Sequence, residues 1–268
     1  MCIRDSHYSD SIVIGFSHLH LNGTGCSDTG DILFMPYTGK ARTQPGTQQD
    51  PLSGYASYYS KDNERALPGY YEVLLKTHRT KVELTASDRV AFHRYTFPKD
   101  VEKHVMINLK DANGDDRPTD TYLEQINDTV IRGYRYSTGW SKKQQIYFSA
   151  VFSQPVHLTL YHDSVQVAGN RLQGLDVKGN VAVAPVVEEL GVKVGISPVS
   201  MENAMDNIGQ EIKDWNFENI VAETTGKWNA ELSKLQVETT DTVAKRIFYT
   251  ALYLSLIHIS EPTRPEPI

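Results

Sequence analysis

The chain has 268 residues, of which 40% are hydrophobic and 22% charged, enough apolar material for a sizeable globular core. Its formal net charge is −6 and no basic stripe runs along it, so nucleic acid is not an expected partner. Two cysteines exclude a disulfide framework, and no apolar run approaches the roughly 18 residues of a membrane span.

Both ends of the sequence differ in character from the rest. Residues 1–6, MCIRDS, lack the apolar core of a signal peptide. Residues 256–268, LIHISEPTRPEPI, contain three prolines that an amphipathic helix cannot continue through. Both pieces resemble translated sequencing adapters. We therefore expect non-native ends on an internal fragment of a longer protein, and the sequence itself does not locate that protein in the cell.

The stretch GFSHLHLNGTGCSDTGD, residues 15–31, concentrates residues that carry chemistry. Its segment GTGCSD, residues 23–28, begins like a dinucleotide-binding loop, but Asp28 stands where a third glycine belongs, so phosphate binding is not supported. No nucleophile elbow surrounds Cys26. His18 and His20 would project to the same side of an extended segment, as in a zinc pair, with Cys26, Asp28 and Asp31 as further ligands.

That zinc site is the less favoured alternative, because the spacing matches no known zinc motif. The other alternative is structural. The histidines would form hydrogen bonds at a strand end, the aspartates would serve turns, and the glycines would supply positive φ angles.

Residues 11–198 have the pattern of an all-β domain. In TKVELTAS, Val82, Leu84 and Ala86 alternate with Lys81, Glu83 and Thr85, which predicts a half-buried strand. Further strands are predicted in RVAFHRYTF, HVMINLK, QQIYFSAVFS and VHLTLYHD. The segments DANGDD (111–116) and VAGN (167–170) are interpreted as turns, and residues 38–54 as a long polar loop. Many strands without intervening helices favour a β-sandwich.

After residue 198 the apolar period changes from 2 to 3.6. Helices are predicted after Ser200 and Asn216, which are suited to be N-caps, and from about Thr240. The predicted fold is therefore mainly β: a large β-sandwich over residues 7–198, followed by linker helices over residues 199–255 that begin an all-α domain.

Seven segments, which follow one another in the family's order along nearly the whole chain, resemble glycoside hydrolase family 92, the exo-acting α-mannosidases. They are GFSHLHLNGTGCSDTGDILFMP, ERALPGYYEVLL, KVELTASDRVAFHRYTFP, GYRYSTGW, IYFSAVFSQP, VKVGISPVSMENAMDNI and IFYTALY. One departure is Asn22, where serine is commoner in the family. The resemblance implies an N-terminal β-sandwich, linker helices and a C-terminal (α/α)6 barrel, here truncated.

The resemblance also implies a function. The parent would be an inverting, calcium-dependent α-mannosidase acting on mannose-containing glycans, and it would be periplasmic or secreted. Its catalytic acid, base and calcium ligands would lie in the missing barrel, so no catalytic or metal residue is assigned here. Loops of the sandwich would close over the mannose pocket. The residues predicted to contact substrate are His18, His20, Gly23, Thr24, Gly25, Cys26 and Asp28.

A fragment of this kind is expected to be inactive alone, because it holds only one wall of the pocket. The alternative function is a stand-alone carbohydrate-binding β-sandwich without catalysis. The helical segments after residue 198 disfavour that alternative.

Overall fold

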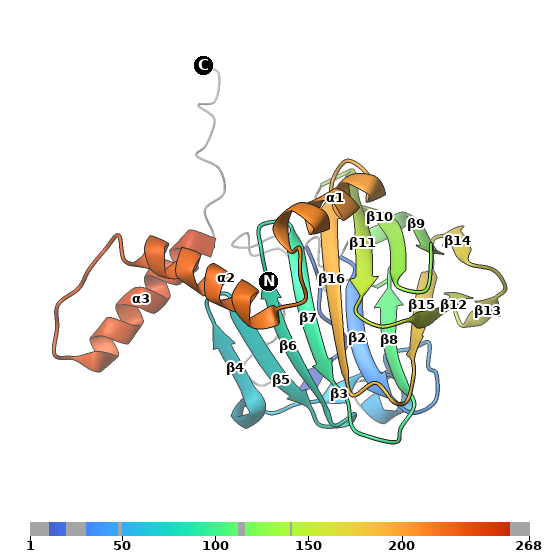
Figure 1. The fold of residues 1–268 in the computed structure, drawn as a ribbon, viewed down its shortest axis with the longest axis horizontal. Coiled ribbons are helices and arrows are strands. Elements are labelled where there is room, and N and C mark those ends of the chain that lie inside the picture. Colours follow the sequence, from blue (N-terminus) through green and yellow to red (C-terminus); the bar gives the residue numbers. More distant parts are fainter. Residues whose placement is uncertain (1–10, 20–30, 48–49, 112–115, 140, 258–268) are drawn as a thin grey trace, which may run out of the picture.

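The computed structural model describes residues 11–19, 31–47, 50–111, 116–139 and 141–257. Within them the elements follow the predicted order, with strands up to Ser197 and then three helices. The strands form two large antiparallel sheets that pack face to face, and helices cover the outer face of the larger sheet (Figure 1). The predicted mainly β fold is therefore confirmed.

The larger sheet has nine strands among the described residues, and all neighbouring strands are antiparallel. Its last strand in the sequence, β16, lies near the centre, so the helix that follows begins over the middle of the sheet (Figure 1). In spatial order the strands are β14 (Arg171–Gly174), β9 (Arg117–Gln125), β10 (Val130–Thr138), β11 (Gln144–Phe152), β16 (Glu189–Ser197), β7 (Val90–Thr96), β6 (Thr80–Ala86), β5 (Tyr70–Leu75) and β4 (Glu64–Leu67).

The smaller sheet has five described strands: β13 (Val165–Val167), β12 (Val156–His162), β15 (Val177–Val183), β8 (Lys103–Asn108) and β2 (Leu33–Thr38). The predicted turn at residues 167–170 joins β13 to β14 and so passes from one sheet to the other. Gly169 in this turn has a φ of 118°, which glycine adopts without strain. Short elements complete the domain: β1 (Ile12–Val13), β3 (Ser57–Tyr58) and the 3₁₀ turns η1 (Pro51–Ser53) and η2 (Lys61–Asn63).

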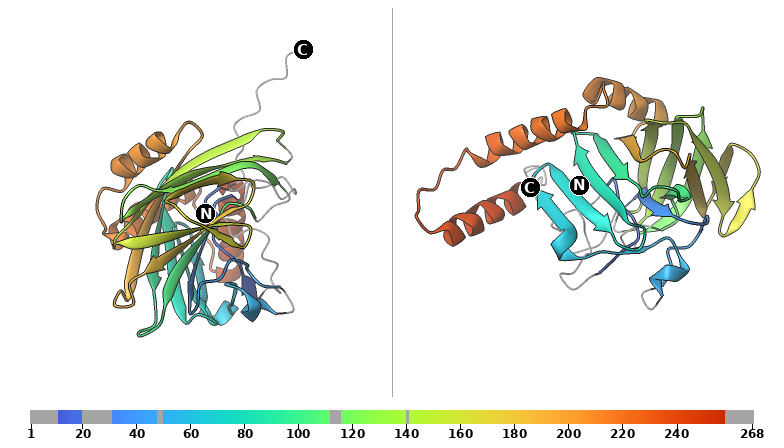
Figure 2. Two further views of the ribbon diagram at one scale, coloured as in Figure 1. Left: turned by 90° about the vertical axis from the view of Figure 1, so that its right-hand side faces the viewer. Right: turned by 60° about the horizontal axis from the view of Figure 1, so that its bottom comes forward.

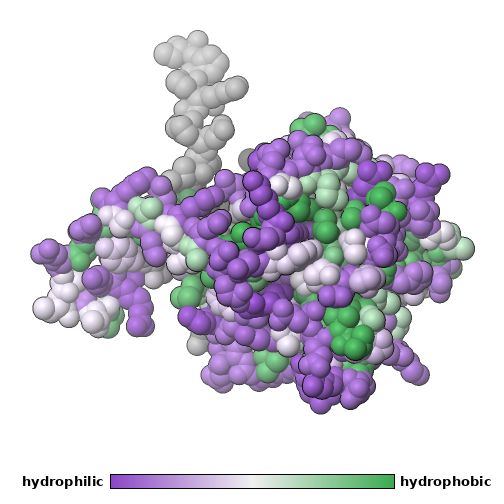
Figure 3. Space-filling view, in the orientation of Figure 1, coloured by the Kyte–Doolittle hydropathy of each residue, from purple (hydrophilic) through white to green (hydrophobic). Residues whose placement is uncertain are grey.

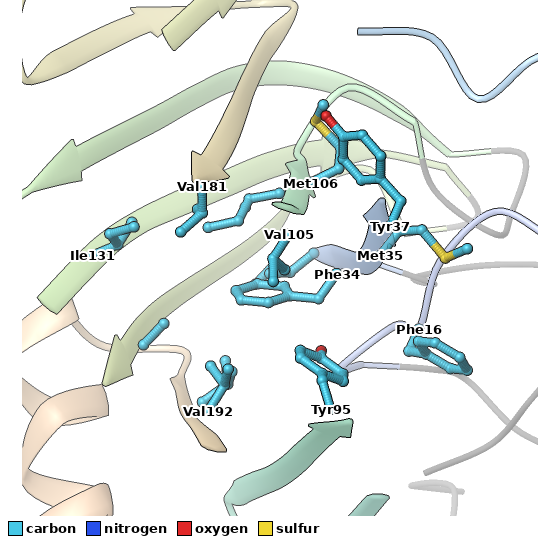
Figure 4. Packing of buried hydrophobic residues seen from close by; sticks show 14 of the residues in the cluster. Phe16, Phe34, Met35, Tyr37, Tyr95, Val105, Met106, Ile131, Val181 and Val192 are labelled. Atoms are coloured by element: carbon cyan, nitrogen blue, oxygen red, sulfur yellow. The ribbon is translucent and has the colours of Figure 1, made fainter. Parts of the chain in front are cut away.

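The inward faces of the two sheets share one hydrophobic core. Phe34 of β2 and Val105 of β8 lie in the same cluster as Tyr95 of β7 and Val192 of β16, and all four are fully buried (Figure 4). Burying a side chain of this size stabilises a fold by about 1.5–3 kcal/mol. Apolar contacts between the inward faces therefore help to hold the two sheets together.

Helices α1 (Met201–Glu211) and α2 (Phe217–Leu232) cover the outer face of the nine-stranded sheet. Both predicted N-caps are confirmed: the side chains of Ser200 and Asn216 accept backbone hydrogen bonds of 3.0 and 3.1 Å at the first turns. At Gly195 of β16, an added Cβ would lie 2.1 Å from the carbonyl oxygen of Ala204. Glycine therefore permits the close approach of α1.

The second helix changes the burial expected for the strand at residues 80–86. The strand itself is confirmed, and Val82 and Leu84 face the core as predicted. Glu83 and Thr85 were expected on a solvated face, yet they are only 6% and 5% exposed. This part of the prediction is wrong, because α2 packs against β6 and covers its outer side.

Helix α3 (Thr242–Ile257) begins close to the predicted residue 240 and pairs with α2 as an antiparallel neighbour at one side of the sandwich (Figure 2). Tyr253 packs on Trp228 of α2 with ring centroids 4.9 Å apart. Val243 and Ile247, about one helical turn apart on α3, form an apolar stripe that remains exposed, at 66% and 64%. No helix in the described part of the chain is both long and apolar enough to cross a bilayer.

The face seen in Figure 3 is mostly hydrophilic, with scattered apolar spots. Against that background, the exposed stripe on α3 predicts self-association of the 268-residue chain. We expect light scattering to show concentration-dependent oligomers. A chain that ends before residue 240, and the double substitution Val243→Glu with Ile247→Glu, should both scatter as monomers. Equal monodispersity of all three proteins would contradict this expectation.

Candidate functional site

The structure describes both ends of the stretch of residues 15–31 as two short arms, residues 16–18 and 31–34, hereafter the stem. Phe16 and Phe34 exchange backbone hydrogen bonds of 2.9 and 3.1 Å. The backbone N–H of His18 then donates to the carbonyl oxygen of Asp31 at 3.1 Å. The arms therefore run antiparallel, and each has a polar side chain near its end.

The first arm of the stem is held by a hydrogen-bonded series of side chains. Nδ1 of His18 lies 2.7 Å from the carbonyl oxygen of Ile32, and Nε2 of His18 lies 3.0 Å from Nε2 of His93. Nδ1 of His93 in turn lies 2.6 Å from the hydroxyl oxygen of Tyr95. His93 and Tyr95 are two residues apart on β7 and therefore share its inward face. Both are almost completely buried.

With both imidazoles neutral, a single arrangement of protons satisfies these contacts. The carbonyl of Ile32 can only accept, so His18 donates from Nδ1 and accepts at Nε2. His93 then donates from Nε2 and accepts the hydroxyl proton of Tyr95 at Nδ1. Burial supports the neutral forms: it lowers the pKa of His18 to about 4 and lowers the pKa of His93 well below its ordinary value.

The second arm of the stem is held by a buried ionic cluster. The guanidinium of Arg135, on β10, is fully buried and contacts the carboxylate of Asp31. Its Nη1 also lies 2.5 Å from Oδ2 of Asp116, and its Nε donates to the carbonyl oxygen of Leu109 at 2.9 Å. Arg135 thus joins the stem to the chain that follows β8. A planar guanidinium suits this task because it donates in several fixed directions.

The predicted substrate residues are only partly covered by the structure. Both ring nitrogens of His18 contact protein groups, which is the strand-end arrangement that the sequence left open beside substrate contact. His20, Gly23, Thr24, Gly25, Cys26 and Asp28 lie outside the described residues. The turn predicted at 111–116 is described only at its ends, because residues 112–115 also lie outside.

Metal binding has no support within the described residues. They contain no group of three or more His, Cys, Asp or Glu side chains that could hold an ion. Of the alternative zinc ligands, His18 contacts His93 and Asp31 contacts Arg135, while His20, Cys26 and Asp28 lie outside the described part of the chain. No zinc or calcium ligand is therefore assigned to the described side chains.

The opposite face of β7 holds the helix that leads away from the sandwich. Arg94 donates to both carboxylate oxygens of Glu83, at 3.0 and 2.9 Å, and also contacts the carboxylate of Glu218 in α2. Its guanidinium lies 4.3 Å from the ring centroid of Phe217. A cleft of about 530 Å³ between α2 and the sheet is lined in part by these groups. The charges satisfy one another there, which favours a structural role.

Sequence reasoning missed His93, Tyr95, Arg135 and Asp116. A signal was present for two of them. His93 falls on the same period-2 face as the apolar Tyr95, and Arg135 falls on the same face as buried Ile131. A polar side chain on an apolar face of a strand needs a buried partner. The pattern shows that need, but it does not show which distant residue meets it.

Family models match almost the whole chain. The model described as glycosyl hydrolase family 92 N-terminal domain matches residues 4–197, which include both sheets. The chain belongs to glycosyl hydrolase family 92. The model described as the catalytic domain of this family matches residues 203–266, which begin within α1.

Solved family 92 structures share this fold. A family 92 α-mannosidase from Bacteroides thetaiotaomicron, solved alone and in complex with mannoimidazole, is 32% identical, with a TM-score of 0.87 over 92% of this chain. Another family 92 glycosyl hydrolase is 26% identical, with a TM-score of 0.81 over 92% of this chain. A curated relative from Arthroderma benhamiae, described as an uncharacterized secreted glycosidase, is 24% identical over 96% of this chain. The present chain covers only 33–34% of the length of those solved chains and 37% of the length of the curated relative.

The buried histidines predict a pH-dependent stability. In the unfolded chain His18 regains its ordinary pKa of 6.5, whereas its pKa in the folded chain is about 4. On acidification the unfolded chain therefore binds the proton first. The free energy of unfolding should fall as the pH drops from 6.5 to 4, by up to about 1.4 kcal/mol per pH unit for each such histidine.

Urea unfolding between pH 4.5 and 6.5 measures this slope. His18→Gln removes one titrating group, so its slope should be smaller than that of the unmodified chain. His157→Gln, on an exposed position of β12, is the matched control and should keep the full slope. An unchanged slope in His18→Gln would show that His18 does not titrate as the buried contacts require.

The Arg135 cluster predicts a large loss of stability on mutation. Arg135→Met removes the buried guanidinium that contacts the carboxylates of Asp31 and Asp116, and breaking a buried ionic contact of this kind costs about 3–5 kcal/mol. Arg132 on the same strand is the matched control, because it pairs at the surface with Glu202. Arg132→Met should cost about 1 kcal/mol or less. Similar urea midpoints for the two variants would contradict the assignment of a buried ionic anchor.

Proposed function

We propose that this chain is the N-terminal part of an inverting α-mannosidase that hydrolyses α-mannosidic bonds in mannose-containing glycans. The observation that carries the proposal is the match of the family 92 catalytic-domain model directly after the sandwich. The 32% identity to a family 92 α-mannosidase over 92% of this chain supports the choice of mannosides as substrates. The description of the curated relative as secreted supports an exported parent.

In this proposal, residues 7–198 form the sandwich domain and residues 199–255 are linker helices that begin the catalytic domain. The stretch of residues 15–31 contributes one wall of the mannose pocket. The stem supports this role, since buried side chains hold both of its arms at the two ends of that stretch. Backbone at glycines such as Gly23 and Gly25 could then approach a sugar ring closely.

The chemistry itself is assigned to the remainder of the catalytic domain. Inversion needs a carboxylic acid that protonates the leaving oxygen and a carboxylate that activates water on the other side of the sugar. The resemblance to the family places these groups and the calcium ligands beyond this chain. Calcium, when bound there, would polarise the mannose. In this proposal the sandwich domain contributes only to binding and orienting the substrate.

The alternative function is carbohydrate binding by the sandwich without catalysis. The catalytic-domain match over residues 203–266 favours the enzyme, because a binding module needs no such continuation. The extended apolar stripe on α3 supports the same choice, since it suits packing against further helices.

Activity assays test the proposal directly. The 268-residue chain should release no mannose from α-1,2-, α-1,3-, α-1,4- or α-1,6-linked mannosides, with or without calcium, because it lacks an acid and base pair. The full-length protein should release mannose with calcium and lose activity with a chelator. In that protein, His18→Ala or His20→Ala should lower turnover by about tenfold.

Controls separate the parts of the proposal. His157→Ala, on the far β12 strand, should leave turnover unchanged. Mannose release by the 268-residue chain would refute the assignment of the chemistry to missing residues. A full-length protein that binds mannosides but cleaves none would favour the binding module. Normal kinetics in both His18→Ala and His20→Ala would show that residues 15–31 do not form a wall of the site.

A further inference from the structure

Four tyrosines gather on the outer face of the nine-stranded sheet, at the end of the sheet that lies away from α2 and α3 (Figure 1). They are Tyr122 of β9, Tyr134 and Tyr136 of β10, and Tyr147 of β11, hereafter the tyrosine cluster. Tyr134 pairs with Tyr122 on one neighbouring strand and with Tyr147 on the other, whereas alternate residues such as Phe148 face the core. All four tyrosines are half-buried, so the cluster lies at the surface of the sandwich.

The rings of the tyrosine cluster are held against one another. Tyr134 stacks on Tyr122, with ring centroids 5.5 Å apart, and on Tyr136, with ring centroids 4.4 Å apart. Tyr147 meets the rings of Tyr134 and Tyr136 edge-on, at centroid distances of 5.9 and 5.7 Å. Rings packed in this way have little rotational freedom to lose when a ligand binds. The cluster is therefore a preformed surface.

The polar groups of this surface have hydrogen-bonding capacity to spare. The hydroxyl oxygens of Tyr136 and Tyr147 lie 2.6 Å apart, and one proton suffices for the bond between them, so the second hydroxyl proton can be donated to a ligand. Oδ2 of Asp120 accepts from the hydroxyl of Tyr134 and from Nε2 of Gln173, both at 2.9 Å. Within the described part of the chain no group donates to Oδ1 of Asp120, which can accept from a ligand.

The chemistry of this surface suits a neutral ligand with many hydroxyl groups. Arg132, on the same face of β10, is paired with Glu124 at 3.2 Å and with Glu202 at 2.9 Å, so its charge is already compensated. The carboxylate of Asp120 repels anions such as phosphates. Sugar hydroxyls both donate and accept, which matches the phenols and the carboxylate, and the C–H face of a pyranose ring can pack on an aromatic side chain. The tyrosine cluster therefore fits a glycan.

Stabilisation of the sheet does not by itself account for the hydroxyl groups. Stacked rings on neighbouring strands would stabilise the sheet equally well as phenylalanines. The bond between the hydroxyls of Tyr136 and Tyr147 lies at half-buried positions, where water can replace either partner, so it adds little to the stability of the fold. Recognition of a polar ligand gives these hydroxyls a role that packing does not.

We propose that the tyrosine cluster, together with Asp120 and Gln173, binds mannose-containing glycans at the outer face of the sandwich. The choice of mannose rests on the proposed α-mannosidase function, whereas the glycan class follows from the cluster itself. Every residue of this surface belongs to the described part of the chain. A glycan bound there stays at the protein, which raises its effective concentration for the rest of the enzyme.

Affinity electrophoresis of the 268-residue chain, in native gels with and without soluble α-mannan, tests the proposal. The informative variant combines Tyr136→Phe with Tyr147→Phe, because it keeps all four rings and removes only two hydroxyls. Tyr134→Ala removes the ring on which two others stack. Melting temperatures show whether each variant is folded, and the double variant decides the matter if Tyr134→Ala does not fold.

The matched control is Tyr70→Phe. Tyr70 is also a half-buried tyrosine on the outer face of the same sheet, and its hydroxyl donates to the carboxylates of Glu72 and Glu83 at 2.6 and 2.8 Å. It lies on β5, however, where it packs against Phe217 of α2 and not in the tyrosine cluster.

We expect α-mannan to retard the unmodified chain. The double variant should bind α-mannan about tenfold more weakly, because two hydrogen-bonding groups are lost, while its melting temperature stays unchanged. Tyr134→Ala should show no retardation, and Tyr70→Phe should bind like the unmodified chain. Migration of the unmodified chain that does not respond to α-mannan would overturn the proposal, as would equal affinities of the double variant and Tyr70→Phe.

The result is independent of hydrolysis. Residues 15–31 are unchanged in every variant, so a loss of binding in the double variant belongs to the tyrosine cluster. If the full-length protein releases no mannose but the 268-residue chain binds α-mannan through the cluster, the proposed enzymatic function fails and the binding surface stands. If the full-length protein is active but α-mannan does not retard the 268-residue chain, the binding surface alone is refuted.

Discussion

Burial of the central strands of the nine-stranded sheet on both faces is the constraint on which the rest of the molecule depends. The smaller sheet covers one face and helices α1 and α2 cover the other. Every side chain on its central strands must therefore find a partner, whichever way it points. Lys193 on β16 illustrates the outward solution: it donates to the carbonyl oxygen of Ile212 at the end of α1 and lies 4.2 Å from the ring centroid of Trp215.

The buried polar groups of this structure differ in the free energy that their desolvation costs, although both kinds form directional hydrogen bonds. Arg135 with its two aspartates is an ionic cluster, and its charges lose much hydration on burial. The His18–His93–Tyr95 series is neutral, so it avoids that cost while keeping directional bonds. Together they attach the two arms of one stem to two strands, β10 and β7, that lie on either side of β11 and β16. Attachment at two separated strands resists tilting better than attachment at one.

The architecture was accessible from the sequence because it depends on local signals. The change of apolar period after residue 198 and the caps Ser200 and Asn216 predicted the helices, and both caps are confirmed. Local signals fail where distant elements meet. The alternation in β6 gave the right strand but the wrong environment for Glu83, since its cover comes from α2, far along the chain. His93 was missed for the same reason: its partner His18 is 75 residues away.

The two faces of β7 connect parts of the molecule that the family models assign to different domains. Inward, His93 contacts the stem; outward, its neighbour Arg94 contacts Glu218 in α2, within the residues matched by the catalytic-domain model. Because adjacent residues of a strand share one peptide plane, a displacement of either side chain's backbone must displace the other. A rigid strand placed there keeps a constant distance between the stem and the start of the catalytic domain. The proposed α-mannosidase, in which both domains would contribute to the active site, would require that constancy, because a displacement of about 1 Å between reacting groups can cost about a hundredfold in rate.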